Sequence, residues 1–337
     1  MCKIRKIQVH KAAELPEEWD LLTGNNPYMK RNFLAFIEKT EKDYSPAYHL
    51  FYEGDRLDSL YLSYPRKDYR LAMFTGSERT VRATLVYLPM CVTANSVVTG
   101  NLRNAVWEDI RSIRGYKMIL NLDDDDVPGF ATGLTCPKCI LDLRFRTFDD
   151  YLAALRSDYR MRTRKVFRKT AALDISFIDN TTEFTDELYR LYLNVLNKSK
   201  VKIETLSKDY FRGEPFRIFV ARLRGKPVGF VQLLENGEEL VFEFVGIDHD
   251  VNREIPVYHR MLYEIVRYGI DHGFRTIDFG QTADEIKLKL GCRYVPLYAA
   301  LHHSNPFVFA LCKIFAKKLQ YKPIKTDFHV FNQGENR

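Results

Sequence analysis

The tripeptide Asp278-Phe279-Gly280 is the one that holds magnesium in protein kinases, so phosphotransfer is the first chemistry to consider. A kinase also needs a glycine-rich loop over the phosphates, a strand lysine and His-Arg-Asp-x-x-x-x-Asn upstream. None of these is present, and the segment before Asp278 is typical of a helix that ends at Gly273. The sequence therefore excludes phosphotransfer. It predicts instead that Asp278 and Gln281 end a strand, where ligands of open α/β sheets collect.

Other side chains suit the transfer of an acyl group to an amine, which needs a proton acceptor, oxyanion donors and a cleft for two substrates. Glu243 interrupts the apolar run LVFEFVGI, where partial burial would raise its pKa toward that of a general base. A carboxylate paired on an edge strand is the alternative. Tyr258 begins a long helix, where its hydroxyl reaches a ligand or its ring packs. His249 follows Asp248 in a loop and either titrates near neutrality at a site or is simply exposed.

A row of arginines lies between the two halves of the chain, in FDDYLAALRSDYRMRTRKVFRKTAAL. Arg156, Arg160, Arg164 and Arg168 stand four residues apart, so one helix would place them in a single stripe. The positive charge is broadened by three neighbours, Arg162, Lys165 and Lys169. The row is either a solvated helix surface or a guanidinium site for phosphate or carboxylate, which arginine binds with two parallel hydrogen bonds.

The elements that must position these residues occur twice. In the first half, AYHLFYEGDRLDSLYLSY predicts a hairpin, and a helix, a stop at Gly115 and the strand YKMILNL follow. In the second half, FRIFVARLRGKPVGFVQLL predicts a hairpin, followed by a further strand, a helix, a stop at Gly273 and the strand RTIDF. The second helix has one apolar face, made of Tyr258, Met261, Leu262, Ile265, Val266 and Gly269. The repeat indicates a duplicated α/β domain.

Three segments carry a resemblance to a known family: YLAALRSDYRMRTRKVFRK, the stretch from Leu240 to Gly280, and EIKLKLGCRYVPLY. Together they resemble the GNAT-type acyltransferase domain of the Fem family of peptidoglycan aminoacyl transferases and its acetyltransferase-like relatives. The resemblance implies an α/β (α+β) fold with mixed sheets, made of two tandem GNAT-like domains. We expect a supporting N-terminal domain at 1–143 and an acyltransferase domain at 144–337, with about the last 30 residues packing back on the first.

The resemblance also implies roles and partners. Lys287 matches a family lysine near the transferred group, where it would stabilise the tetrahedral intermediate; a solvated lysine beside Glu285 is the alternative. The donor would be acyl-CoA as a co-substrate, with no bound cofactor, and the acceptor a small-molecule or lipid-linked amine. The loop GIDHDVNREIPVYHR lacks the paired glycines that bind pyrophosphate in GNAT domains. Acyl carrier protein and aminoacyl-tRNA therefore remain alternative donors, and so does a non-catalytic binding protein on the same fold.

Composition sets broader bounds. A net charge of +7 favours anionic partners without demanding nucleic acid, and tRNA is the less favoured one because no coiled-coil arm is present. The six cysteines and the absence of a signal-like or spanning apolar run predict a cytoplasmic protein. No metal site is expected, either at Cys136-Pro-Lys-Cys139 or at the aspartates 123–126. The segment NPFVFALCKIFAKKLQYKPIK predicts a helix whose stripe Phe307, Leu311, Phe315 and Leu319 packs on a domain or contacts the inner face of a membrane.

Overall fold

The computed structural model of the protein describes residues 4–70, 80–88, 93–199, 205–325 and 328–332. The chain divides into two compact units. Unit 1 comprises Met1–Pro137, Lys200–Leu206 and Pro296–Pro323, and unit 2 comprises Lys138–Ser199, Ser207–Val295 and Ile324–Arg337.

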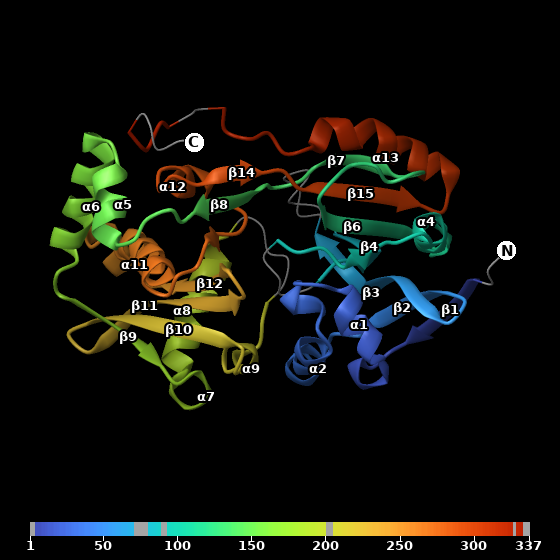
Figure 1. Cartoon of the computed structure of the whole chain (residues 1–337), viewed down its shortest axis with the longest axis horizontal. Coiled ribbons are helices and arrows are strands. Elements are labelled where there is room, and N and C mark those ends of the chain that lie inside the picture. Colours follow the sequence, from blue (N-terminus) through green and yellow to red (C-terminus); the bar gives the residue numbers. More distant parts are fainter. Residues whose placement is uncertain (1–3, 71–79, 89–92, 200–204, 326–327, 333–337) are drawn as a thin grey trace. The chain divides into compact units, whose positions relative to one another are not determined.

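Unit 1 is built on a mixed sheet with the strand order β1-β2-β3-β4-β6-β15-β7, and β5 pairs with β3 (Figure 1). Its strands are β1 (Ile4–Val9), β2 (Ala47–Glu53), β3 (Arg56–Arg70), β4 (Thr80–Val86), β5 (Val97–Val98), β6 (Tyr116–Leu122), β7 (Ala131–Leu134) and β15 (Tyr298–His303). Its helices are the 3-10 turns η1 (Ala12–Glu14) and η2 (Pro27–Met29) and the α-helices α1 (Glu17–Leu22), α2 (Arg31–Thr40), α4 (Arg103–Ser112) and α13 (Pro306–Leu319). The strands β4 and β6 run parallel, and the other pairs are antiparallel.

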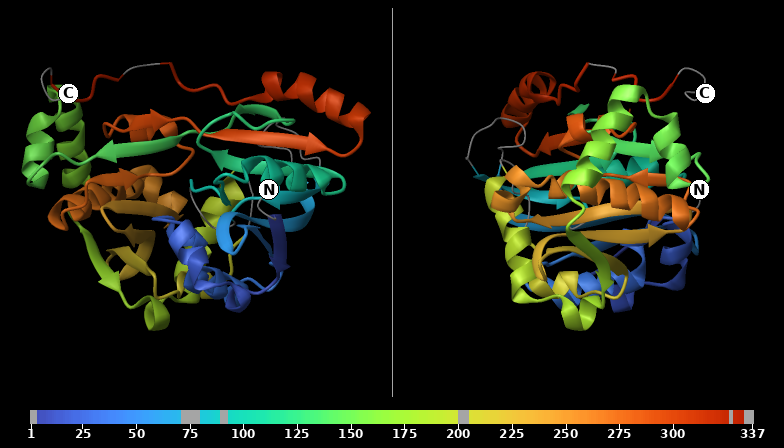
Figure 2. Two further views of the ribbon diagram at one scale, coloured as in Figure 1. Left: turned by 45° about the vertical axis from the view of Figure 1, so that its right-hand side comes forward. Right: turned by 90° about the vertical axis from the view of Figure 1, so that its left-hand side faces the viewer.

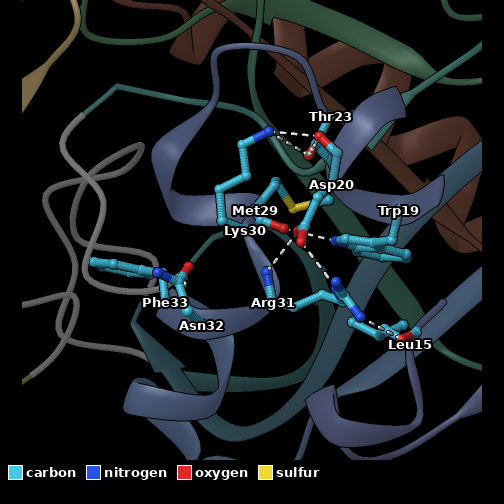
Figure 3. Close-up of polar contacts among 9 residues, drawn as sticks. All are labelled: Leu15, Trp19, Asp20, Thr23, Met29, Lys30, Arg31, Asn32 and Phe33. Atoms are coloured by element: carbon cyan, nitrogen blue, oxygen red, sulfur yellow. Dashed lines mark hydrogen bonds and ion pairs between the residues drawn. The ribbon is translucent and has the colours of Figure 1, made fainter. Parts of the chain in front are cut away.

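A polar network joins α1 to the start of α2 (Figure 3). The Asp20 carboxylate accepts hydrogen bonds from the backbone N–H and the Nε of Arg31, at 2.9 and 2.8 Å. Trp19 is fully buried, and its indole N–H donates to the Met29 carbonyl. Lys30 Nζ donates to the Asp20 carbonyl. These bonds satisfy polar groups at helix ends that would otherwise lack partners.

Unit 2 contains a seven-stranded mixed sheet with the order β14-β8-β13-β12-β11-β10-β9. Its strands are β8 (Lys138–Asp142), β9 (Leu173–Ile178), β10 (Phe216–Leu223), β11 (Lys226–Asn236), β12 (Glu239–Ile247), β13 (Thr276–Asp278) and β14 (Arg293–Val295). Its helices are α5 (Phe148–Ala154), α6 (Ser157–Lys169), α7 (Asn180–Glu183), α8 (Asp186–Lys198), α9 (Lys208–Phe211), α10 (His249–Glu254), α11 (Val257–Asp271) and α12 (Asp284–Leu288). The helices α11 and α8 cover opposite faces of this sheet (Figure 2).

Helix α11 forms where the apolar periodicity predicts it. Met261, Leu262, Ile265 and Val266 of the predicted face have no exposed surface. Gly269 of the same face leaves room for neighbours, since a Cβ there would lie 2.8 Å from the Leu143 side chain. The helix ends at Asp271, and Gly273 follows with a φ of +73°, a left-handed conformation that glycine adopts at no steric cost.

The two units share one topology, which confirms the predicted duplication and fold class. Both predicted hairpins are present, as β2–β3 and β10–β11. In each unit a single parallel pair, β4–β6 or β12–β13, is linked through a helix, α4 or α11. The sixth place in each sheet, counted from β1 in unit 1 and from β9 in unit 2, belongs to a strand from beyond the local repeat: β15 in unit 1 and β8 in unit 2. The predicted boundary after residue 143 lies just beyond β8, and the predicted segment 144–337 includes β15 and α13, which belong to unit 1.

Two local expectations differ from the structure. The arginine-rich segment is two helices rather than one, because Leu155 and Arg156 leave the helix to pair with another segment: Leu155 bridges to Phe331, and the Arg156 N–H donates to the Val330 carbonyl. Arg156 therefore lies outside the stripe.

The C-terminal helix α13 does contact β7 and β15, but not through the whole predicted stripe. Phe307 is 83% exposed and Leu311 55%, whereas Cys312 is buried. The side chains of Phe315 and Leu319 lie outside the described residues.

Candidate active site

The end of β13 turns sharply. The Asp278 carboxylate is 2% exposed and accepts a hydrogen bond from the Gly280 N–H at 2.7 Å. Gly280, Thr282 and Ala283 all have positive φ, at 70°, 64° and 52°. Such values are uncommon outside glycine and mark strain in the β-branched Thr282. Strained backbone of this kind clusters at functional sites, which makes this loop a candidate.

Lys287 of α12 is hydrogen-bonded to this loop. Its Nζ donates to the Gln281 carbonyl at 2.7 Å, and its side chain is 3% exposed. Burial lowers the pKa of Lys287, and the carboxylates of Asp278 and Asp284 oppose that shift because negative charge favours the ammonium. The alternative of a solvated lysine is therefore wrong.

Two thiols belong to the same cluster. Cys139 on β8 has no exposed surface, and burial raises its pKa to about 12, so it is a neutral thiol at pH 7. Cys292 is 7% exposed, and its pKa is raised by burial. Among the described residues no group of three or more His, Cys, Asp or Glu is arranged to hold a metal ion.

Glu243 occupies a bulge in β12. Gln232 of β11 lies opposite Phe244, while Leu233 lies opposite Phe242, so Glu243 is the extra residue between them. It is 7% exposed. β12 is an inner strand, between β11 and β13, but its pairing with β13 ends at Val241, so at Glu243 only the β11 side of β12 is paired. Bulges of this kind are common next to active sites, where they re-aim a side chain.

The start of α11 differs from a helix terminus that is free to bind an anion. The Tyr258 N–H donates to Asn252 Oδ1 at 2.9 Å, and the Val257 N–H donates to the Ile255 carbonyl. In place of a glycine loop the chain forms α10, whose first amides donate to the Asp248 carboxylate. The amides of Val257, Tyr258, Asp250 and Val251 therefore already have partners within the chain.

Burial raises the pKa of the Tyr258 hydroxyl, and Cys139 and Cys292 raise it further, so Tyr258 lies near the Lys287 cluster and stays protonated at neutral pH. Asp278, Gln281 and Lys287 meet at the end of β13, and Tyr258 approaches them from α11. Glu243 lines neither of the two cavities described below.

A basic groove of about 470 Å³ opens beside the first turns of α11. It lies between α6, α11 and α12, and it is lined by Tyr159, Arg162, Lys165, Val166, Lys169, Pro256, His259, Tyr263, Glu285, Ile286, Lys289 and Leu290. Arg162, Lys165 and Lys169 make no ion pair with any carboxylate among the residues that the structure describes, whereas Lys289 pairs with Glu285. The lining of the groove therefore carries an excess of positive charge.

His259 belongs to this groove and was missed in the sequence. Partial desolvation lowers its pKa, and the charge of Lys289 lowers it further, so the imidazole is neutral at pH 7. Helical periodicity was the available signal, because His259 and Tyr263 stand one turn apart on the face of α11 beside its predicted apolar stripe.

The remaining predicted residues lie elsewhere. Arg160, Arg164 and Arg168 line a second cavity on another face of α6. His249 is the first residue of α10, half-buried, with its Nε2 3.3 Å from the Asn194 carbonyl oxygen on α8. The structure thus separates the arginine row and His249 from the residues that meet at β13.

A mixed sheet with one parallel strand pair joined by a long helix, present twice in one chain, defines a tandem GNAT-type acyltransferase fold. Residues 153–288 match the family described as acetyltransferase (GNAT) domain. No curated protein matches the chain.

Solved structures agree with this fold. FemX is 10% identical with a TM-score of 0.55, over 91% of this chain and 100% of that one. A tandem GNAT protein from the clavulanic acid biosynthesis pathway is 11% identical with a TM-score of 0.54, over 90% and 99%. L-PGS from Bacillus licheniformis is 12% identical with a TM-score of 0.50, over 84% and 95%. At these identities the likeness concerns the fold, and it confirms the GNAT and Fem-like resemblance.

Proposed function

We propose that this protein is an N-acyltransferase that moves an acyl group from a phosphate-bearing donor, acyl-CoA in the first place, to an amine of a cell-envelope, polysaccharide or lipid precursor. The observation that carries the proposal is the basic groove beside the start of α11. It offers Arg162, Lys165 and Lys169, which have no carboxylate partner among the described residues, next to the helix that links the parallel strands.

The groove supports a particular way of holding the donor. Since the first amides of α10 and α11 already donate to Asp248, Asn252 and Ile255, the phosphates bind side chains instead. Lysine and arginine contacts of this kind are long and flexible, so donor affinity should fall steeply with salt. The same recognition suits other phosphate-bearing donors, including the phosphopantetheine of an acyl carrier protein and tRNA.

The reaction itself forms a bond between the acceptor nitrogen and the acyl carbon and breaks the carbon–sulfur bond of the thioester. The nitrogen loses one proton, and the leaving thiolate gains one. We assign proton acceptance to Glu243, in the β12 bulge, and proton donation to the Tyr258 hydroxyl, whose raised pKa keeps it protonated. Lys287, Asp278 and Gln281 fix the strained loop between β13 and α12.

For the acceptor, a lipid-linked amine would bring the protein to a membrane surface. Within the described residues no helix is long and apolar enough to cross a membrane. Exposed apolar side chains do lie on α13, at Phe307, Leu311 and Ile314. We place any peripheral membrane contact there.

A thermal-shift screen tests whether the protein binds an acyl donor, and which one. The ligands are acetyl-CoA, longer acyl-CoAs, acyl carrier protein and tRNA. We expect stabilisation by acyl-CoA, and mass spectrometry should then detect acylated amines when candidate precursors are added. Salt-dependent stabilisation by tRNA alone would favour the aminoacyl-tRNA-dependent peptidyl transferase of the Fem type.

The screen has an internal control in Lys226→Glu, which changes the exposed first residue of β11, a residue that does not line the groove. Its donor response should equal that of the unaltered protein. If no donor stabilises the protein, the enzyme proposal fails, and a non-catalytic binding protein on the tandem GNAT fold becomes the better account.

A further inference from the structure

A second cavity, of about 750 Å³, lies along the row of arginines on α6, Arg160, Arg164 and Arg168. It is bounded by α5, α6 and α11, and its lining residues are Phe148, Asp149, Leu152, Ser157, Arg160, Met161, Arg164, Phe167, Arg168 and Arg267. We call it the arginine cavity. Its volume falls in the range of pockets that hold small molecules, roughly 300–1,000 Å³.

The charged part of the lining, which we call the rim of the arginine cavity, is strongly positive. Four guanidinium groups face a single lining carboxylate, that of Asp149. Arg160, Arg164 and Arg168 form no ion pair with a carboxylate in the part of the chain that the structure describes, and they repeat about every 6 Å along the helix. Only Arg267 has such a partner, Glu264, at 3.5 Å.

Four lining residues of the arginine cavity are apolar, and together we call them its floor: Phe148, Leu152, Met161 and Phe167. The Arg267 guanidinium lies over the rings of Phe148 and Phe167, at 4.7 and 5.2 Å from their centroids, which holds it at the boundary between rim and floor. Met161 is 62% exposed, which is unusual for a methionine and leaves apolar surface available to a ligand.

A ligand of the arginine cavity must pair with the guanidinium groups and also cover the apolar lining residues. Inorganic phosphate would pair the arginines but leave the floor in water, and a neutral hydrocarbon would cover the floor but leave the guanidinium groups without acceptors. We infer that the arginine cavity binds an anionic amphiphile, with a phosphate or carboxylate head on Arg160, Arg164 and Arg168 and an apolar tail over Met161 and Phe167.

This site is separate from the donor groove of the proposed function. On a helix with 100° per residue, Arg160, Arg164 and Arg168 point to one side of α6, whereas Arg162, Lys165 and Lys169 centre well over 90° away. The two sets of lining residues share no member. The inference therefore stands whether or not the groove binds acyl-CoA.

The test measures binding of dodecyl phosphate, below its aggregation concentration, by isothermal titration calorimetry. We expect binding to the full chain, weakened at least about tenfold in Arg164→Glu/Arg168→Glu, as the loss of two charge-assisted contacts implies. Met161→Glu should weaken it several-fold as well, and this exposed position leaves folding intact. Inorganic phosphate and the uncharged dodecyl maltoside should each bind at least about tenfold more weakly than dodecyl phosphate.

The matched control is Lys165→Glu/Lys169→Glu, with the same charge change on the same helix, and it should keep dodecyl phosphate affinity within about twofold. Vesicles of phosphatidylglycerol and phosphatidylcholine distinguish the source: retention that Arg164→Glu/Arg168→Glu abolishes assigns a membrane lipid, and calorimetric binding without retention assigns a free amphiphile. Equal affinity in the unaltered protein and Arg164→Glu/Arg168→Glu overturns the inference. So does inorganic phosphate binding as tightly as dodecyl phosphate.

Discussion

Lys287 and Glu243 are both nearly removed from solvent, yet we expect their substitution to have different effects, on stability and on the transfer rate. Lys287 donates to the Gln281 carbonyl and faces Asp278 and Asp284, so it stabilises a loop. Glu243 lies in a β-bulge of the central strand β12, where a carboxylate is not needed for pairing. We therefore expect substitution of Lys287 to lower stability first, and substitution of Glu243 to lower activity.

We expect Lys287→Met to lower the free energy of unfolding by about 3 kcal/mol, because buried carboxylates lose their counter-charge. Glu243→Gln, which keeps the shape, should lower the acyl-transfer rate by roughly 10²- to 10⁴-fold with little change in stability. Thermal unfolding and the transfer rate, measured on both variants, check this. Full activity in the Glu243→Gln and Lys287→Met double variant would sink the proposed mechanism.

We expect His259 to make donor binding depend on pH. Its pKa is lowered below the usual value near 6.5, so it is neutral at pH 7 and becomes cationic only on acidification through that lower pKa. The added charge should strengthen acetyl-CoA binding as the pH falls from 7.5 to 5. Titration calorimetry on the unaltered protein and His259→Gln isolates this effect from protonation of the phosphates. The same pH profile in both proteins would show that His259 does not face the donor.

In unit 1, His49 makes stability depend on pH. Burial lowers the pKa of His49 to about 3, and the charge of Lys6 also lowers it. Below a pH of about 6.5 the unfolded chain binds a proton that the folded chain does not, so the free energy of unfolding falls on acidification by up to ~1.4 kcal/mol per pH unit until about pH 3. The effect is absent above pH 6.5.

Tryptophan fluorescence can follow this in unit 1 alone, since both tryptophans, Trp19 and Trp107, belong to it. His49→Phe, which keeps a ring stacked on Tyr61, should make the free energy of unfolding of unit 1 depend less on pH. Ser63→Ala removes the hydrogen-bond partner of the imidazole but not the titrating group, so it should keep the slope. An unchanged slope in His49→Phe would assign the dependence to other groups.

At the scale of elements, local sequence patterns predict most helices and hairpins that form from neighbouring residues. The two hairpins and α11 follow from turn residues and apolar periodicity, which depend on contiguous sequence. The break at Leu155 does not, because its cause is pairing with Phe331, far along the chain. The basic groove was missed for the same reason: its charges come from α6 and from the region of α12, and only the fold brings these helices to His259.

The contact of β12 with β11 and α8 leaves no room for another carbon. A Cβ on Gly246 would lie 2.1 Å from the Phe230 ring and 2.9 Å from Leu191 Cβ. We therefore expect Gly246→Ala to destabilise unit 2 by about 1–3 kcal/mol, as overpacking does. Hydrogen exchange of the α8 and β11 amides measures this. Phe230→Leu in the same chain should recover part of the loss, and an unchanged exchange rate in Gly246→Ala alone would contradict the packing argument.

At the scale of the molecule, each sheet depends on a strand from outside its own repeat. Unit 1 needs β15 between β6 and β7, and unit 2 needs β8 between β13 and β14. The sequence repeat predicted the duplication. It could not predict that β15 and β8 pair outside their own repeats, because that pairing joins segments far apart in the sequence.

Dividing the chain at the predicted boundary should therefore fail. Fragment 1–143 lacks β15, and fragment 144–337 lacks β8, so each leaves central hydrogen-bonding edges unpaired. We expect neither fragment alone to give a cooperative unfolding transition, while co-expression gives a folded complex. Circular dichroism with thermal melting measures this. A cooperative melt from either fragment alone would show that its exchanged strand is dispensable.

The central claim is that a phosphate-bearing acyl donor binds the side-chain groove beside α11. The affinity of acetyl-CoA for the unaltered protein, Lys165→Glu/Lys169→Glu and Arg164→Glu/Arg168→Glu tests it most directly, by calorimetry at two salt concentrations. Our account predicts at least about a tenfold loss in the first variant, a smaller salt dependence there, and near-normal affinity in the second. Equal acetyl-CoA affinity in the unaltered protein and Lys165→Glu/Lys169→Glu would contradict the account.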